Sequence, residues 1–171
     1  MSEETTQTQW VRYVAMRLLF LLDAQPDIDD TALRDAAKHP AKEAGDVFPS
    51  DVLLPHDAME FPDEFPDRVV NRAIEQACGA FDARERSDRI TGALAPDWPA
   101  PRQAAVDRAI LRLGVYELSQ AKSPAPVVIN ELVEMSRTFG TERSPAFVNA
   151  LLDKVARDLG RLPASESSVS G

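Results

Sequence analysis

Apolar side chains recur every three or four residues along most of this 171-residue chain, and they alternate one by one over no useful length. The first spacing places side chains on one face of an α-helix, whereas alternation is typical of a β-strand. We therefore predict an all-α protein with no strand and about six or seven helices. The expected helices cover residues 8–24, 30–38, 66–79, 81–94, 101–122, 126–139 and 144–160.

Prolines and acidic residues mark the exception to this pattern. Five prolines within residues 39–66 interrupt any long helix, and residues 43–67 contain 8 acidic side chains and no Lys or Arg. We predict a long, acidic, proline-rich loop over about 39–66 inside a single domain that spans residues 1–162. The Ser-rich segment 163–171 is expected to be a disordered tail.

The net charge of −9 argues against a general attraction to nucleic acids, because phosphate contacts need Lys and Arg. The charge is unevenly distributed, however. Residues 101–160 carry 8 basic and 7 acidic side chains, so most of the acidity belongs to the first hundred residues. A local basic face in the second half of the chain therefore remains compatible with the sequence.

Several classes of protein find no support in the sequence. Cys78 is the only cysteine of the sequence, and the polar start does not resemble a signal peptide. No apolar run is long enough to cross a membrane. We therefore expect a cytoplasmic protein. His39 and His56 show no metal-ligand spacing, and there is no glycine-rich phosphate loop. We expect neither catalysis, nor a metal, nor a cofactor.

Four motifs in the second half follow one another in a specific order. They are VDRAILRLGVYEL at residues 106–118, PVVINELVE at 126–134, RTFG at 137–140 and FVNALLDK at 147–154. Their order and spacing resemble those of the NusB family, whose helices read roughly (D/E)(R/K)A(I/V)LRxAxYEL and PxxVAINEx(V/I)E. The first hundred residues agree with that family in helix layout more than in motif.

The resemblance implies a compact fold of two small packed helical bundles and no cofactor. It also implies that the chain acts in transcription antitermination at ribosomal RNA operons. Members of the family pair with the ribosomal protein NusE, bind the boxA sequence of nascent RNA and act on the transcription elongation complex. Some members form homodimers, so the resemblance allows a homodimer here.

The chain departs from the family at the start of the first helix. Typical members carry an Arg-rich run there that contacts boxA phosphates, whereas residues 8–12 of this chain keep only Arg12, with Arg17 five residues on. By resemblance, Arg12 and Arg17 are the candidate phosphate contacts. Trp10 and Tyr13 could compensate by stacking on RNA bases, or could pack in the core, as large aromatic side chains usually do.

Further site residues follow from the resemblance. Phe147 lies where the family contacts RNA, so it either stacks on a base or packs in the core. Arg143 and Lys154 are candidate phosphate contacts, and Asp107 and Arg108 lie where the family meets NusE; each could equally be an ordinary charged side chain. The acidic segment 43–67 is expected to lie away from the face that carries Arg12 and Arg17.

Two other functions remain open at this point. A NusB-like module could keep the protein-docking face without strong RNA binding, because the Arg-rich run is reduced. A NusB-like domain also opens certain ribosomal RNA cytosine methyltransferases, although these 171 residues contain no cofactor-binding domain.

Overall fold

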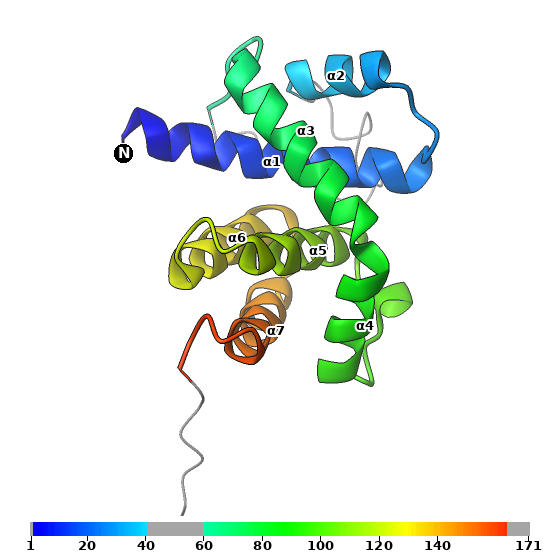
Figure 1. The fold of residues 1–171 in the computed structure, drawn as a ribbon, viewed down its shortest axis with the longest axis vertical. Helices are drawn as coiled ribbons and strands as arrows, with labels where there is room; N and C mark the ends of the chain where they lie inside the picture. The colour runs from blue at the N-terminus through cyan, green and yellow to red at the C-terminus, as the bar shows by residue number, and fades with distance from the viewer. Residues whose placement is uncertain (1, 41–59, 164–171) are drawn as a thin grey trace, which may run out of the picture.

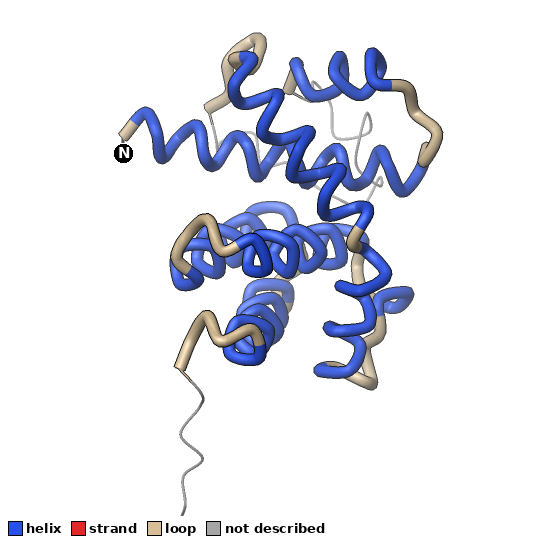
Figure 2. Tube along the Cα trace, viewed as in Figure 1, coloured by secondary structure: helices blue, strands red, loops and turns tan. Residues whose placement is uncertain are grey.

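The computed structural model describes residues 2–40 and 60–163, and this part of the chain contains seven α-helices and no strand (Figure 2). The all-α prediction is confirmed. The helices are α1 (Glu3–Ala24), α2 (Asp30–Lys38), α3 (Asp67–Asp82), α4 (Arg84–Leu94), α5 (Ala105–Gln120), α6 (Ala125–Phe139) and α7 (Ser144–Asp158), with a short 3-10 turn, η2 (Ala100–Arg102), before α5.

Helices α1, α2 and α3 form the upper bundle in Figure 1, where α3 crosses α1 and α2 packs on α3. Helices α5, α6 and α7 pack on one another in the lower bundle, and α4 lies against α5 and α7. Helix α5 also contacts α1 and α3, so one hydrophobic core continues through both bundles. The prediction of two small packed bundles is confirmed.

Some helix ends agree with local capping rules. Asp29 caps α2, since its side chain accepts a hydrogen bond from the backbone N–H of Ala32 at 2.9 Å. Helix α1 begins at Glu3, five residues earlier than expected, because the hydroxyl of Ser2 caps it by accepting from the N–H of Thr5 at 3.2 Å. A polar side chain at the right position therefore extends the helix beyond its apolar stripe.

The expected end of α3 at residue 79 is wrong, whereas the expected start of α7 at residue 144 is confirmed. Gly79 does not end α3, which continues to Asp82. A Cβ at Gly79 would lie 2.4 Å from Cζ of Tyr116, so the glycine makes room for a ring on α5. Ser144 belongs to α7 and does not cap it; its Oγ accepts from the backbone N–H of Thr141 at 2.8 Å instead.

The expected acidic loop and tail lie mostly outside the described residues, since residues 41–59 and 164–171 are not described. The described ends of the loop contradict its expected position, because they pack on the face of α1 that carries Tyr13 and Arg17. The ring of Phe61 stacks on Tyr13 at 4.4 Å between centroids, and the carbonyl of His39 accepts a hydrogen bond from Arg17.

Candidate nucleic-acid interface

One exposed stripe on α7 brings together three of the predicted RNA contacts. Arg143, Phe147 and Lys154 follow one another at intervals of four and seven residues, which places them on one face of a helix. Arg143 and Lys154 are exposed, while Phe147 is half-buried and packs partly against the core. We call these three residues the α7 stripe. The stripe presents one cation on each side of an aromatic ring.

The side chain of Arg12 is not on an open surface. It is 2% exposed and pairs with Glu117 of α5, with Nε 3.0 Å from Oε1 and Nη2 2.9 Å from Oε2. Glu117 is itself 7% exposed, so two opposite charges satisfy each other between the two bundles. The expected phosphate contact at an exposed Arg12 is therefore corrected to a buried ion pair.

Tyr13 and Arg17 are also buried, at 1% and 4% exposure. The ring of Tyr13 packs between Phe61 and Phe139, and the guanidinium of Arg17 lies 5.4 Å from the centre of the Tyr13 ring. Nη1 of Arg17 donates to the carbonyl of His39 at 2.9 Å. Neither side chain reaches solvent in this structure, so both hold the loop ends on α1, and their burial argues against a direct contact with RNA.

Trp10, the other aromatic candidate on α1, packs at the edge of the core. Its ring meets Phe65 edge to face at 5.8 Å, and its Nε1 donates to the carbonyl of Glu60 at 3.2 Å. Of the two alternatives for Trp10, the structure favours packing over base stacking.

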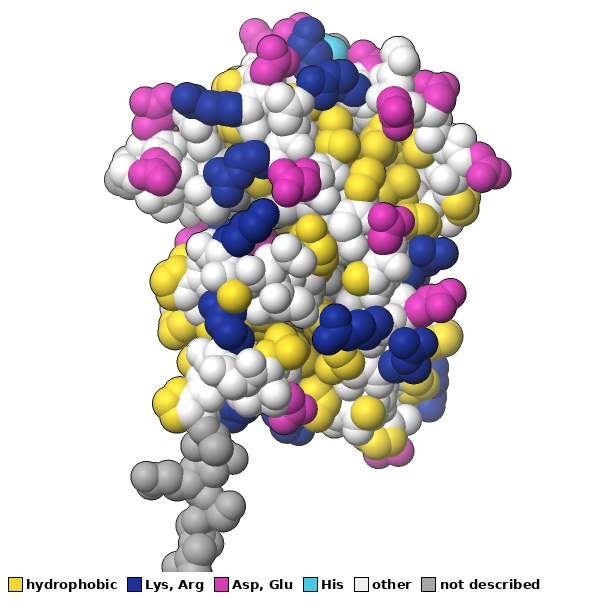
Figure 3. All heavy atoms as spheres, viewed as in Figure 1, with side chains coloured by type: hydrophobic (Ala, Val, Ile, Leu, Met, Phe, Trp, Pro, Cys, Tyr) yellow, Lys and Arg dark blue, Asp and Glu magenta, His cyan; other side chains and the backbone are white. Residues whose placement is uncertain are grey.

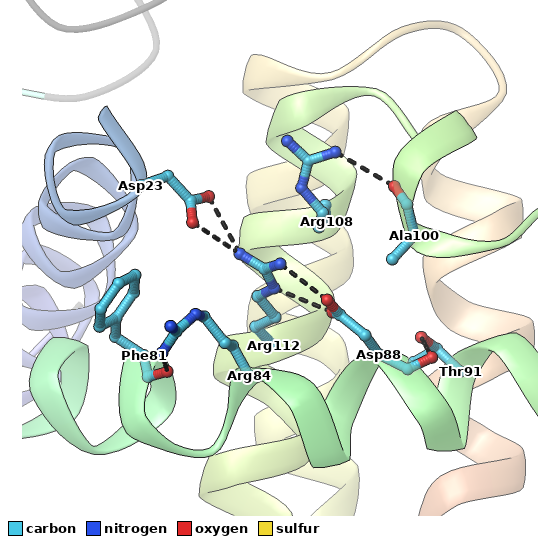
Figure 4. A network of polar contacts seen from close by, with 8 residues as sticks. All are labelled: Asp23, Phe81, Arg84, Asp88, Thr91, Ala100, Arg108 and Arg112. Atoms are coloured by element: carbon cyan, nitrogen blue, oxygen red, sulfur yellow. Dashed lines mark hydrogen bonds and ion pairs between the residues drawn. The ribbon is translucent and has the colours of Figure 1, made fainter. Parts of the chain in front are cut away.

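The two expected partner contacts at the start of α5 differ in exposure. Asp107 is 6% exposed, whereas Arg108 is half-buried and donates through Nη1 to the carbonyl of Ala100 at 3.1 Å (Figure 4). Burial raises the pKa of the Asp107 carboxyl, and a hydrogen bond with Ser144 of α7 partly opposes this. A direct partner contact by Asp107 is therefore not supported, while one by Arg108 stays a prediction.

A carboxyl group with a raised pKa makes the stability of the fold depend on pH. Asp107 binds its proton more tightly in the folded chain than in the unfolded chain, so its contribution to stability falls as the pH rises through the raised pKa. We expect Asp107→Asn to be more stable than wild type at neutral pH. The difference should shrink below the ordinary Asp pKa of about 3.9. Urea unfolding of both proteins across this range checks this, and a difference independent of pH would contradict it.

Arg112, which sequence analysis did not single out, joins three helices. Its side chain contacts Asp88 of α4 with two hydrogen bonds of 2.9 and 2.7 Å and Asp23 of α1 at 3.0 Å (Figure 4). Burial alone would lower the pKa of Arg112, but the two carboxylates outweigh it and raise that pKa. This network fixes α4 against both bundles.

On the face drawn in Figure 3, acidic side chains concentrate over the upper bundle, whereas Lys and Arg side chains lie over both bundles. This agrees with the uneven charge of the two halves of the chain. Within residues 2–40 and 60–163, no cluster of His, Cys, Asp or Glu is arranged to hold a metal ion. None of the described helices is long and apolar enough to cross a membrane.

A cleft lies between α1, α3 and the end of α5, with about 590 Å³ of empty space including its open mouth. Arg12 and Glu117 line it from α1 and α5, and Arg72 and Gln76 line it from α3. The segment after α7 lies beside the end of α5 near this cleft, since Arg161 donates to the carbonyls of Leu118 and Ser123 at 2.6 and 2.7 Å.

Comparison with known proteins agrees with this fold. The model of the NusB family matches residues 11–157. The transcription antitermination protein NusB of Symbiobacterium thermophilum is 34% identical over 164 residues, which covers 93% of this chain and 95% of the relative. The protein of the same name from Solibacter usitatus is 37% identical over 131 residues, covering 73% and 80%. The crystal structure of T. maritima NusB matches with a TM-score of 0.64 at 22% identity, over 90% of this chain and 96% of that one.

Proposed function

The chain belongs to the NusB family, and on that premise we propose that it is a transcription antitermination protein that acts by binding and not by catalysis. In this proposal it binds boxA-type RNA of nascent ribosomal RNA transcripts, together with the ribosomal protein NusE, within the transcription elongation complex in the cytoplasm. The names of its relatives support antitermination, and the exposed α7 stripe supports RNA binding.

The α7 stripe is the observation that carries the RNA-binding proposal. Two exposed cations can neutralise phosphates, and a half-buried aromatic ring between them can stack on a base that is not paired. The ring is held by the core on one side, so less conformational entropy is lost when a base stacks on the other. Shape and charge at this stripe therefore suit a single RNA strand.

Variants of the α7 stripe test the proposal. Each phosphate contact to a single strand contributes about 0.7 to the slope of log affinity against log salt, so replacing Arg143 and Lys154 by Ala should flatten that slope by about 1.4. Phe147→Ala should weaken binding by roughly five- to hundredfold, because stacking is worth about 1–3 kcal/mol, and should leave the slope unchanged. Fluorescence anisotropy with boxA-type RNA at several salt concentrations measures both quantities.

Arg137→Ala is a matched control for these variants. Arg137 lies on α6 and pairs with Glu134 of the same helix, and its side chain is 61% exposed. We expect this variant to bind RNA as wild type does. If the α7 variants also retain wild-type affinity and slope, the α7 stripe is not the RNA-binding surface.

A specific observation favours a second candidate function, a protein-docking module with weak RNA binding. Arg12 and Arg17, the cations that would replace the Arg-rich run of the family, are both buried. The α7 stripe would then serve a protein partner, and a homodimer would be one such assembly. An RNA affinity that is undetectable even in the presence of NusE would support this alternative.

A further inference from the structure

Trp98, in the turn between α4 and η2, exposes an aromatic ring that the fold holds in place. It is 46% exposed, and no other aromatic side chain within residues 2–40 and 60–163 is exposed to this degree. The N–H of Trp98 donates to the carbonyl of Ala95 at 3.0 Å, and Nε2 of the buried Gln103 donates to the carbonyl of Trp98 at 3.1 Å. The backbone of Trp98 is thus fixed on both sides, so the exposure of its ring is a property of the fold.

Arg102 orients this ring. Its guanidinium lies 5.1 Å from the centre of the Trp98 ring, within the range of a cation–π contact, and its Nη1 donates to the carbonyl of Asp97 at 3.3 Å. We call Trp98 and Arg102 the η2 pair. Because the guanidinium is engaged by the ring and by a carbonyl, it holds the indole, and the exposed part of the ring stays open to a ligand. A flat ring that is held before binding loses little conformational entropy when another flat group stacks on it.

The η2 pair lies at the end of the lower bundle where the α7 stripe begins. Asp107, in the first turn of α5, forms a hydrogen bond with Ser144, the first residue of α7, which directly follows Arg143 of the stripe. Arg108, the next residue of α5, donates to the carbonyl of Ala100 in η2 at 3.1 Å (Figure 4). Helix α4 also contacts both α7 and η2. The turn before α5 and the first turn of α7 therefore adjoin each other.

The η2 pair also belongs to the basic part of an acidic chain. Residues 84–112 carry 6 basic and 4 acidic side chains, whereas the whole chain has a net charge of −9. One of the four acidic groups, Asp88, pairs with Arg112, and another, Asp107, is 6% exposed. A basic surface attracts the phosphates of a nucleic acid, and an exposed ring within it can stack on an unpaired base. These charges favour a single RNA strand as the ligand over a basic segment of a protein.

We propose that the η2 pair is a second RNA contact of this chain, at which the ring of Trp98 stacks on an unpaired base of the strand that the α7 stripe binds. This inference rests on the proposed RNA binding and extends it from α7 to the turn before α5. The strand passes over the adjoining first turns of α7 and α5 to reach the ring. Since the guanidinium of Arg102 is engaged by that ring, the contact is made by stacking and adds no cation to the salt dependence.

Tryptophan fluorescence reports this contact directly. The chain has two tryptophans, so Trp10→Phe leaves Trp98 as the only one. Stacking of a base on the indole should quench its fluorescence as boxA-type RNA is added, with the same midpoint as the binding curve from anisotropy. The matched variant is Trp98→Phe, in which the remaining tryptophan packs on Phe65; its fluorescence should change little.

The affinity measures what the contact contributes. Trp98→Ala should weaken the binding of boxA-type RNA about fivefold or more, because the stacking of one base is lost, and should leave the salt slope unchanged. Val127→Ala is the matched control, since Val127 is 47% exposed on α6 and belongs to neither RNA contact; it should bind RNA as wild type does. Circular dichroism checks that both variants are folded, as we expect for exposed side chains.

Shortened RNAs separate this contact from the α7 stripe. Removing nucleotides from one end of the RNA should abolish the difference between wild type and Trp98→Ala, while the loss caused by Phe147→Ala remains. The two effects separate in this way because the two rings stack on different bases.

The outcomes separate this inference from the proposed function. If Trp98→Ala binds RNA as Val127→Ala does, and RNA leaves the fluorescence of Trp98 unchanged while the α7 variants lose affinity, the second contact is refuted and RNA binding stands. A weaker binding of Trp98→Ala to NusE alone, measured by calorimetry without RNA, would show that the η2 pair docks a protein and would overturn the inference. If the wild type binds no RNA even in the presence of NusE, both the inference and the proposed RNA binding fail.

Discussion

Arg12→Ala is expected to lower the free energy of unfolding by about 3–5 kcal/mol, because it leaves the carboxylate of Glu117 buried without a counter-charge. Glu117 is 7% exposed, and its described hydrogen bonds come from Nε and Nη2 of Arg12. Chemical denaturation followed by circular dichroism measures the loss.

Arg72→Ala is the matched control for this prediction. Arg72 lines the same cleft from α3 but is exposed, so its removal should change the stability by no more than about 0.5 kcal/mol. The double variant Arg12→Met, Glu117→Leu removes both charges and should recover most of the stability lost in Arg12→Ala. An Arg12→Ala protein as stable as Arg72→Ala would show that the buried pair does not hold the two bundles together.

Much of the fold could be predicted from the sequence because its signals are local. The apolar period located most of the described helices, and the expected bounds of α2, residues 30–38, agree with the structure. The end of α3 was missed because a distant side chain decides the local structure. Nothing near Gly79 in the sequence shows that Tyr116 of α5 packs on it.

The candidate site was harder to predict, for the same reason. Charged side chains are exposed by default, so an arginine on the first helix is assigned to the surface unless its partner is known. The partner of Arg12 lies 105 residues away. The burial of Arg112 did leave a signal, since its neighbours Ile110, Leu111 and Leu113 place apolar side chains on the other faces of the same helix.

The second large effect is expected from the partner protein. With Arg143 and Lys154 as the cations of the α7 stripe, the chain alone should bind boxA-type RNA weakly, with a salt slope of only about 1.4. NusE contributes a second RNA-contacting surface in this proposal. Joining two surfaces on one RNA makes the second contact intramolecular, so the affinity should rise by about 100-fold or more.

The affinity of the chain for boxA-type RNA should be titrated with and without NusE at matched salt concentrations. We predict weak binding by the chain alone and binding tighter by about 100-fold or more with NusE, and we expect this gain to be lost when Phe147, Arg143 and Lys154 are replaced together. An RNA of the same length with a scrambled sequence should gain less from the partner. Tight binding by the chain alone with a steep salt slope, or no RNA binding even with NusE, would show that the chain and NusE do not bind this RNA jointly through the α7 stripe.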